Sequence, residues 1–196
     1  AVDRSGFRSR TTIHPCVLKT TWDNREDPGL FVGDEKTSGA GAGELSEPRG
    51  ITTDADGNVY VCDHLNHRVC VFAPSGKPLA QLPAKNADLV AVHQKTGAIY
   101  VLGTQHHEHR NLNEYEAGNN YTRKELFKFT SRNATKPVAS IVLAADSYGR
   151  GVIALDESGD KPVIWAASLT SHHPGLRKIV DEGDSFRDGG YPIEER

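Results

Sequence analysis

Histidine is the residue type whose placement in this sequence most clearly suggests chemistry. The 196-residue chain contains nine histidines, and seven of them lie in three short polar segments. These segments are 63–68, 104–110 and 171–174. Neutral imidazole is a common ligand of zinc, copper, nickel and iron. The densest group, His106, His107 and His109, is therefore a candidate site for a divalent metal.

A structural role is the alternative for the same histidines, and we give it more weight. Adjacent residues such as His106 and His107 point to opposite sides of an extended chain. The spacing of the three groups also matches no fixed metal-ligand motif. We expect most of these histidines to be loop residues and the chain to hold no cofactor, with a bound divalent metal as the alternative.

The segment 54–58 contains two aspartates and an asparagine, as the start of a calcium-binding loop does. The helical calcium loop also needs a glutamate at its twelfth position, where this chain has Leu65. The pair Asp56-Gly57 is instead typical of a tight hairpin turn, and β-branched and apolar runs flank it on both sides. A hairpin turn is the better interpretation.

The elements that must position these residues are predicted to be short β-strands in a recurring unit. The first four strands are expected at 51–53, 59–62, 68–73 and 78–82. The pattern of strand, turn and strand recurs at 89–102 and 152–167. Placing Gly97 on Gly57 puts Tyr100 on Tyr60, which gives a repeat of about forty residues.

A four-stranded unit that repeats at this interval is typical of a β-propeller, in which each blade packs its faces against its neighbours. A β-sandwich, which also has short strands and regular turns, is the alternative. The repeat of a whole unit favours the propeller, and so do the apolar runs, which suit strands covered on both faces. The predicted fold class is all-β, with four-stranded antiparallel blades.

The best-defined copy of the unit also resembles a known family. It contains Gly43-Glu44-Leu45-Ser46-Glu47-Pro48-Arg49-Gly50-Ile51, then Asp56-Gly57-Asn58-Val59-Tyr60-Val61, Asp63, Asn66-His67-Arg68-Val69, Val71-Phe72 and Gly76-Lys77. Over residues 43–82 this order closely resembles an NHL repeat, whereas the other copies are degenerate and lack the Asn-His-Arg element. The resemblance implies a six-bladed propeller that is a binding platform in larger proteins and sometimes an enzyme.

The repeats divide the chain into the parts of a single partial propeller over residues 1–196. We expect the end of a blade at 1–34, an NHL-type blade at 44–83, a blade at 86–143 with a polar insert at 106–120, and a further blade at 150–190. Six blades would need roughly 240 residues. With three to four blades, the ring is expected to be incomplete, and a four-bladed ring is the alternative. The remaining blades would belong to a larger parent chain, of which this chain is a fragment.

Four residues of the NHL-type blade are predicted to contact a ligand or to support the contact. The first strand of a propeller blade lines the central channel, so Arg49 is placed to meet an anionic ligand or to pair with Asp63. Arg68 is the second candidate contact. We expect Asp63 and His67 to be structural partners of the two arginines.

The predicted function is a binding or scaffold module without enzymatic activity. Its loop-rich face would recognise a protein, peptide or glycan, with the insert at 106–120 as a specificity loop. The alternative is a metal-dependent enzyme that resembles the amidating lyases or the gluconolactonase-like lactonases. Those families place a histidine or an asparagine where this chain has Arg49, although Asp63 matches the aspartate that ends strand two in the lactonases. The departure at Arg49 weakens both activities.

Charge and hydropathy narrow the classes of partner. The net charge is −3, and an acidic segment lies at 181–184, so a nucleic-acid partner is disfavoured despite Arg49, Arg68, Arg110 and Arg123. The sequence contains no run of eighteen apolar residues, the length that a membrane-spanning helix needs. The missing initiator methionine fits a cleaved export signal, so we expect an extracellular or periplasmic location.

Two of the three cysteines, Cys62 and Cys70, can be interpreted in two ways. Cys62 and Cys70 are expected nearly opposite each other across a hairpin, which would allow a disulfide. Burial of both as small apolar side chains between blades is the preferred interpretation.

Overall fold

A computed structural model of the chain describes residues 30–34, 36–106, 122–146, 151–159, 161–168 and 175–189. The chain divides into two compact units, Ala1–Leu30 and Phe31–Arg196, and the strands lie in the second. The prediction of a blade end at 1–34 falls mostly outside the described residues. The described residues 31–34 and 36–46 form turns, bends and irregular segments.

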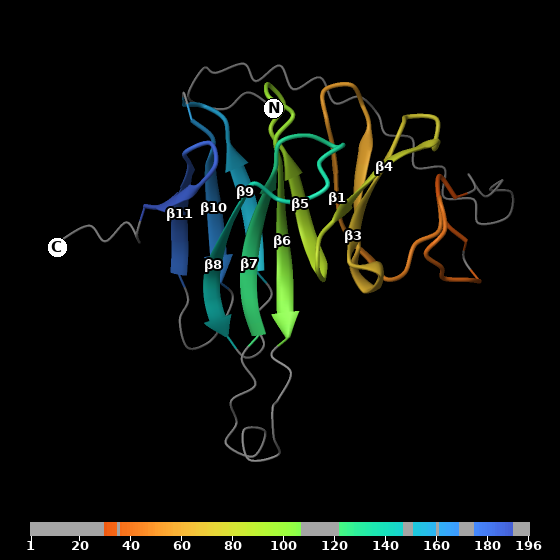
Figure 1. The fold of residues 1–196 in the computed structure, drawn as a ribbon, viewed down its shortest axis with the longest axis horizontal. Coiled ribbons are helices and arrows are strands. Elements are labelled where there is room, and N and C mark those ends of the chain that lie inside the picture. The colour runs from red at the N-terminus through yellow and green to blue at the C-terminus, as the bar shows by residue number, and fades with distance from the viewer. Residues whose placement is uncertain are drawn as a thin grey trace, which may run out of the picture. The chain divides into compact units, whose positions relative to one another are not determined.

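Three four-stranded antiparallel sheets follow one another along the described chain (Figure 1). Blade 1 consists of β1 (Pro48–Thr53), β2 (Val59–Asp63), β3 (Arg68–Phe72) and β4 (Pro78–Pro83), with the short 3-10 helix η1 (His64–Asn66) between β2 and β3. Blade 2 consists of β5 (Ala87–Val92), β6 (Ile99–His106), β7 (Thr122–Phe129) and β8 (Ala139–Asp146). Blade 3 consists of β9 (Gly151–Asp156), β10 (Val163–Ser168), β11 (Gly175–Asp181) and β12 (Phe186–Asp188).

The sheets confirm the predicted all-β class and the predicted propeller blades. Each sheet pairs its strands in sequence order, and none of the three closes on itself. The part of the chain that the structure describes contains no helix of the length and apolar character needed to cross a membrane.

Alternating side chains bury both faces of the middle strands. Tyr60 and Cys62 on β2 belong to a core shared with blade 2, whereas Val61 faces Val32 and Leu45 on the other side of the sheet. Burying a side chain such as Val or Leu contributes about 1.5–3 kcal/mol. Burial on both faces explains why β2 and β6 begin with continuous apolar runs rather than alternating ones.

Blade 2 has the same arrangement one repeat later. Ile99 and Val101 on β6 face blade 1, while Tyr100 and Leu102 face a second core shared with Ile164 and its neighbours in blade 3. The predicted equivalence of Tyr60 and Tyr100 is thereby confirmed, because each lies one residue into its strand and faces the following blade. The repeat thus places equivalent side chains at successive blade interfaces.

Blade 3 differs from the other two on the face turned away from blade 2. Val152 and Leu176 lie on that face with relative exposures of 46% and 45%. Trp165 lies on the same face, with the ammonium of Lys178 5.8 Å from its ring centroid. Val152 on β9 and Leu176 on β11 flank Ala167 of β10, so this face of blade 3 exposes apolar side chains from two of its strands.

Gly50 allows the first strands of blades 1 and 2 to approach each other closely. A Cβ atom at this position would lie 2.6 Å from the carbonyl oxygen of Asp88 and 2.7 Å from the Cα of Leu89. Backbone atoms cannot give way as the end of a side chain can. The sequence therefore needs glycine here for β1 to pack directly against β5.

The hairpin interpretation of segment 54–58 is confirmed. Gly57 adopts a positive φ of 78°, and the carboxylate of Asp54 accepts hydrogen bonds from the backbone N–H groups of Asp56 and Asn58. Its second oxygen accepts the hydroxyl of Tyr60 at 3.0 Å. The acidic side chain is therefore used to close the turn.

Cys62 and Cys70 lie nearly opposite each other in the hairpin, as expected, but they do not form the disulfide that was the alternative interpretation. Cys62 is paired with Val69, and Cys70 with Val61, so the two thiols are one residue out of register and point to opposite faces of the sheet. Both cysteines are free and buried. Burial raises the pKa of the Cys62 thiol to about 12 and that of Cys70 to about 11. They are packing residues, as the preferred interpretation held.

Candidate functional site

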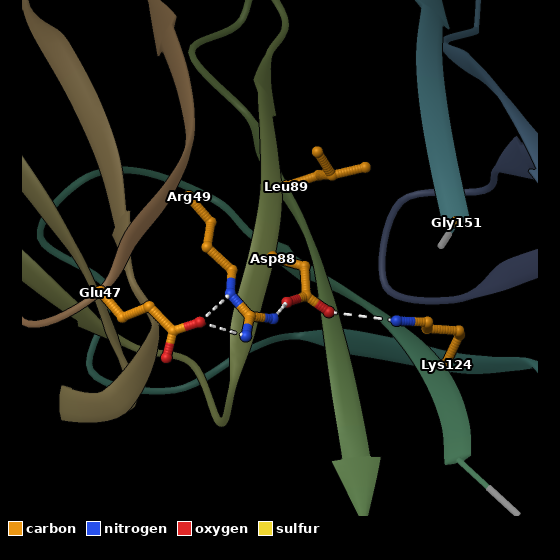
Figure 2. A pocket seen from close by; sticks show the side chains of 6 residues that line it. All are labelled: Glu47, Arg49, Asp88, Leu89, Lys124 and Gly151. Carbon is orange, nitrogen blue, oxygen red and sulfur yellow. Dashed lines mark hydrogen bonds and ion pairs between the residues drawn. The ribbon is translucent and has the colours of Figure 1, made fainter. Parts of the chain in front are cut away.

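A charged pocket lies where the first strands of the three blades begin, and we call it the inner-strand pocket. It is lined by Glu47, Arg49, Asp88, Leu89, Lys124 and Gly151. Figure 2 shows Arg49 between Glu47 and Asp88, with Lys124 on the far side of Asp88. The volume of about 430 Å³ falls within the range of sites that bind small ligands or a few side chains.

Shifts in strand register at the same point of blades 1 and 2 direct the side chains of Arg49 and Asp88 into this pocket. The register of β1 against β2 shifts between Pro48 and Ile51, and that of β5 against β6 shifts between Ala87 and Leu89. Because Pro48 and Ala87 are paired with equivalent residues, Arg49 and Asp88 occupy equivalent bulged positions. A bulge re-aims the side chain of its extra residue, and bulges are common beside functional sites.

Asp88 is the centre of the polar contacts in the pocket. Its Oδ1 atom accepts a hydrogen bond from Arg49, and its Oδ2 atom accepts from the Thr104 hydroxyl and, at 3.2 Å, from the Lys124 ammonium. The Nδ1 atom of His64 lies 3.2 Å from Oδ1. With a side-chain exposure of 13%, this carboxylate is committed to groups of the protein itself.

These donors keep Asp88 ionised. Burial alone would raise its pKa, but the hydrogen bonds from Thr104 and Arg49 and the charge of Lys124 outweigh burial and hold the pKa below its ordinary value. The aspartate therefore stays an anion at neutral pH and fixes the positions of the two cations. It has no spare proton for acid catalysis.

Arg49 is the more accessible cation of the pocket, with a side-chain exposure of 39%. Its Nε and Nη2 atoms donate to Oε1 of Glu47, and its Nη1 atom donates to Asp88. These two carboxylates outweigh the effect of burial and raise the pKa of the guanidinium. The prediction that Arg49 pairs with Asp63 is wrong, because the bulge turns its side chain toward β5.

Asp63 pairs with Arg68 instead, and this pair fastens the segment before β1. The Oδ2 atom of Asp63 accepts from Arg68 Nε at 2.7 Å, and its Oδ1 atom accepts from the backbone N–H of Ser46 at 2.6 Å. The remaining nitrogens of Arg68 donate to the carbonyls of Ala40, Gly41 and Glu44. Asp63 is fully buried and Arg68 is 8% exposed, so this geometry is that of a structural ion pair.

The two histidines of blade 1 are also held by internal contacts. His67 adopts a left-handed conformation with φ of 54°, and its Nδ1 atom accepts the backbone N–H of Asn86 at 3.3 Å. His64 is buried, and its Nδ1 atom contacts the carbonyl of Ala87 at 3.2 Å. Both rings therefore connect blade 1 to the linker and first strand of blade 2.

The proposed metal ligands cannot be placed. His107 and His109 lie outside the described residues, and His106 is described only as the last residue of β6. Elsewhere in the described ranges, no three His, Cys, Asp or Glu side chains are arranged to hold a metal ion. The metal site stays a prediction from the sequence.

Reasoning from the sequence included Arg49 but missed the groups that surround it. Asp88 and Lys124 both lie in one degenerate copy of the repeat, so no motif singled them out. One available signal was spacing, because Asp88 follows Arg49 by 39 residues, close to the repeat of forty shown by the tyrosines. A bulge in one copy could have been expected in the next.

Comparison with known proteins supports the repeat assignment. The NHL repeat model matches residues 45–72, which cover β1, β2, η1 and β3. The RING finger protein nhl-1 of Caenorhabditis elegans is 45% identical over 60 residues. That match covers 31% of this chain and 6% of the relative. The repeat match and the four-stranded blades together show that this chain contains an NHL repeat at residues 45–72.

Proposed function

We propose that this chain is a binding module without enzymatic activity, and that a protein or peptide partner docks at the inner-strand pocket. NHL repeats commonly mediate protein interactions, which supports this class of partner. The observation that carries the proposal is the convergence of β1, β5 and β9 on a pocket that exposes Arg49. A rigid sheet framework with charged groups at the strand starts suits recognition.

Arg49 rather than Arg68 is assigned to the partner. Every nitrogen of the Arg68 side chain donates a hydrogen bond to Asp63 or to a backbone carbonyl. A ligand could bind Arg68 only if these structural hydrogen bonds were broken. Asp63 supports the site by holding the segment before β1, and His67 supports it by holding the linker before β5. A glycan is the alternative ligand expected from the sequence.

The rest of a parent propeller is a second proposed partner. The exposed Val152 and Leu176 and the half-buried Trp165 support the packing of a further blade against blade 3. The extracellular or periplasmic location and the lactonase-like or lyase-like activities stay predictions.

A peptide selection on the full 196-residue chain tests the proposed function. Random twelve-residue peptides displayed on phage would be selected for binding, and the affinities of synthetic copies measured for wild type, Arg49→Ala and Arg187→Ala. Arg187 is the matched control, because it is an exposed arginine on β12 that donates to Glu182 at 2.9 Å, as Arg49 donates to Glu47.

We expect peptides whose affinity falls at least tenfold with Arg49→Ala and changes less than twofold with Arg187→Ala. Thermal unfolding would verify that each variant is folded. Peptides that bind all three proteins equally would contradict the location of the site. A glycan array that yields ligands where the peptide selection yields none would change the class of partner.

A further inference from the structure

We infer that the inner-strand pocket recognises a carboxylate side chain of its partner, and that Glu47 occupies the recognition arginine until the partner displaces it. This inference rests on the proposed function, because it names the chemistry by which the same pocket would read a peptide. It assigns distinct parts to three charged groups of the pocket: Arg49 reads the ligand, Asp88 positions Arg49, and Glu47 competes with the ligand.

The balance of donors and acceptors in the pocket favours an anionic ligand group. A guanidinium has five N–H donors. Within the described residues, Arg49 uses one donor of Nε, one of Nη2 and one of Nη1, so one N–H remains on each terminal nitrogen. Displacing Glu47 also frees the neighbouring N–H groups of Nε and Nη2, and a ligand carboxylate can accept two parallel hydrogen bonds from that pair, which is the strong bidentate arrangement. Figure 2 shows the guanidinium lying between its two carboxylate partners.

Asp88 is unsuited to contact the ligand itself. It accepts from Arg49, Thr104 and Lys124, and His64 lies beside it. A cationic ligand would therefore find this anion already neutralised. What Asp88 does is hold the Arg49 guanidinium on the pocket side of β5, which lowers the entropic cost of ligand capture.

Glu47 has the properties of a placeholder. It is 46% exposed, and its only described partner is Arg49, to which a single oxygen, Oε1, is committed. It also adopts a positive φ of 54°, a conformation that non-glycine residues seldom adopt. An exposed pair of this kind contributes little to stability, so exchanging one carboxylate for another is energetically easy.

The partner class that these features favour is an acidic peptide segment rather than a nucleic acid. Nucleic-acid affinity comes from several cations along a phosphate chain. The pocket instead has two cations, Arg49 and Lys124, balanced by Glu47 and Asp88. A pocket of about 430 Å³ also suits one or two side chains better than a polynucleotide backbone.

A mutant cycle between protein and ligand tests the inference. The probe is the tightest peptide from the phage selection, synthesised in its selected form and with each aspartate or glutamate changed in turn to its amide. Affinities would be measured for wild type, Arg49→Lys and Glu47→Gln, with Arg187→Lys and Glu182→Gln as the matched pair on blade 3.

Three results are expected. One amide substitution in the peptide lowers wild-type affinity at least tenfold. Arg49→Lys, which keeps the charge but loses the bidentate geometry, weakens the acidic peptide at least fivefold and leaves the amide form nearly unchanged. Glu47→Gln tightens the acidic peptide threefold or more, because the internal competitor is gone, while the blade 3 variants change affinity less than twofold.

Other outcomes separate this inference from the proposed function. If selected peptides require Arg49 in the alanine test but are neutral or basic, the pocket binds a partner and the carboxylate inference is wrong. If Glu47→Gln weakens the acidic peptide, the placeholder role is wrong. If no peptide depends on Arg49, the proposed function fails first. The last outcome concerns single-stranded RNA at about 150 mM salt, which is the physiological ionic strength. Retention of RNA that depends on Arg49 under these conditions would overturn both the proposed function and the carboxylate inference.

Discussion

Blades 1 and 2 share a strand order and a register, yet different polar groups hold the linker in front of each first strand. In blade 1 the carboxylate of Asp63 binds the linker, and Arg68 neutralises it. The residues paired at the equivalent positions of blade 2 are Gly103 and Glu125. The apolar pattern specifies the sheet in both blades, whereas the polar groups that hold the linker differ between them.

Blade 2 uses the backbone and an asparagine for the same task. The carbonyl of Asn86 accepts the backbone N–H of Thr104 at 3.0 Å, and its side-chain amide donates to the carbonyl of Thr104 at 2.8 Å. A Cβ on Gly103 would lie 2.5 Å from the carbonyl oxygen of Lys85, so the linker fills the space that an aspartate would need. An ion pair is one way, and not the only way, to secure the start of a blade.

The two blades also differ at the bulge that follows the linker, and this difference creates the site. Both blades have a residue with positive φ before the first strand, Glu47 in blade 1 and Asn86 in blade 2. The bulged residue is basic in blade 1, Arg49, and acidic in blade 2, Asp88. Because the two blades are adjacent, these residues pair across the pocket. The chemistry of the pocket thus arises where successive repeats diverge.

Removing the ion pair of blade 1 should have the largest effect on stability. Asp63→Ala leaves the Arg68 guanidinium buried without a counter-charge, which costs about 3–5 kcal/mol of unfolding free energy. Asn86→Gly removes the neutral hydrogen bond of blade 2 while keeping the positive φ, and should cost about 1 kcal/mol. Chemical denaturation of both variants measures the difference. Equal losses would show that the two fastenings are energetically alike.

Adding a side chain at the close contact between β1 and β5 should have the next largest effect on stability. Gly50→Ala places a Cβ against the backbone of β5 and should cost about 3 kcal/mol, the upper end for overpacking. Gly159→Ala is the control, because its new Cβ would meet nothing nearer than the carbonyl of Lys161 at 3.8 Å. Thermal unfolding compares them. A Gly50→Ala protein as stable as the control would contradict the close approach of β1 and β5.

The equivalent tyrosines should separate contacts within a blade from contacts between blades. The hydroxyl of Tyr100 donates to the buried Asp181 of blade 3, so Tyr100→Phe should cost about 2 kcal/mol. The hydroxyl of Tyr60 donates to Asp54 within its own blade, and Tyr60→Phe should cost about 1 kcal/mol. Urea denaturation measures both losses. A larger loss at Tyr60 would contradict the importance of the interface between blades 2 and 3.

The pH dependence of Asp88 should be the smallest of these effects. Its pKa in the folded chain lies below the ordinary value of about 3.9, so its stabilising contribution is complete above about pH 4 and is lost as the pH falls through the folded pKa. Asp88→Asn removes this contribution. Below about pH 4, the unfolding free energy of the variant should therefore vary less with pH than that of the wild type. Denaturation at several pH values measures it, with the exposed Asp56→Asn as control. Parallel curves for wild type and Asp88→Asn would contradict the assignment.

Much of the fold could be predicted because short-range patterns encode it. The hairpin at 54–58 was specified by Asp56-Gly57, and the two-sided burial of β2 and β6 by their continuous apolar runs. The faces of Cys62 and Cys70 could not be predicted, because a shift of one residue in the pairing moves a side chain to the other face of the sheet. Such a shift depends on the pairing of whole strands and leaves no local trace.

The site was only partly predictable because its members come from three blades. Arg49 stood out from a repeat pattern, whereas Asp88 and Lys124 become its neighbours only when blade 2 packs against blade 1. Arg68 matched the pattern equally well but is buried. A repeat motif thus marks residues that hold a blade and residues that face a ligand without distinguishing them.

Backbone amide shifts in NMR spectra of the 21.4 kDa chain, titrated with the selected peptide, test the central claim most directly. If the peptide binds the inner-strand pocket, the largest shifts will cluster where the first strands begin, at Glu47, Arg49, Asp88 and Leu89. Shifts centred instead on the turns at 54–58 and 93–97, at the other ends of those strands, with the pocket amides unchanged, would contradict it.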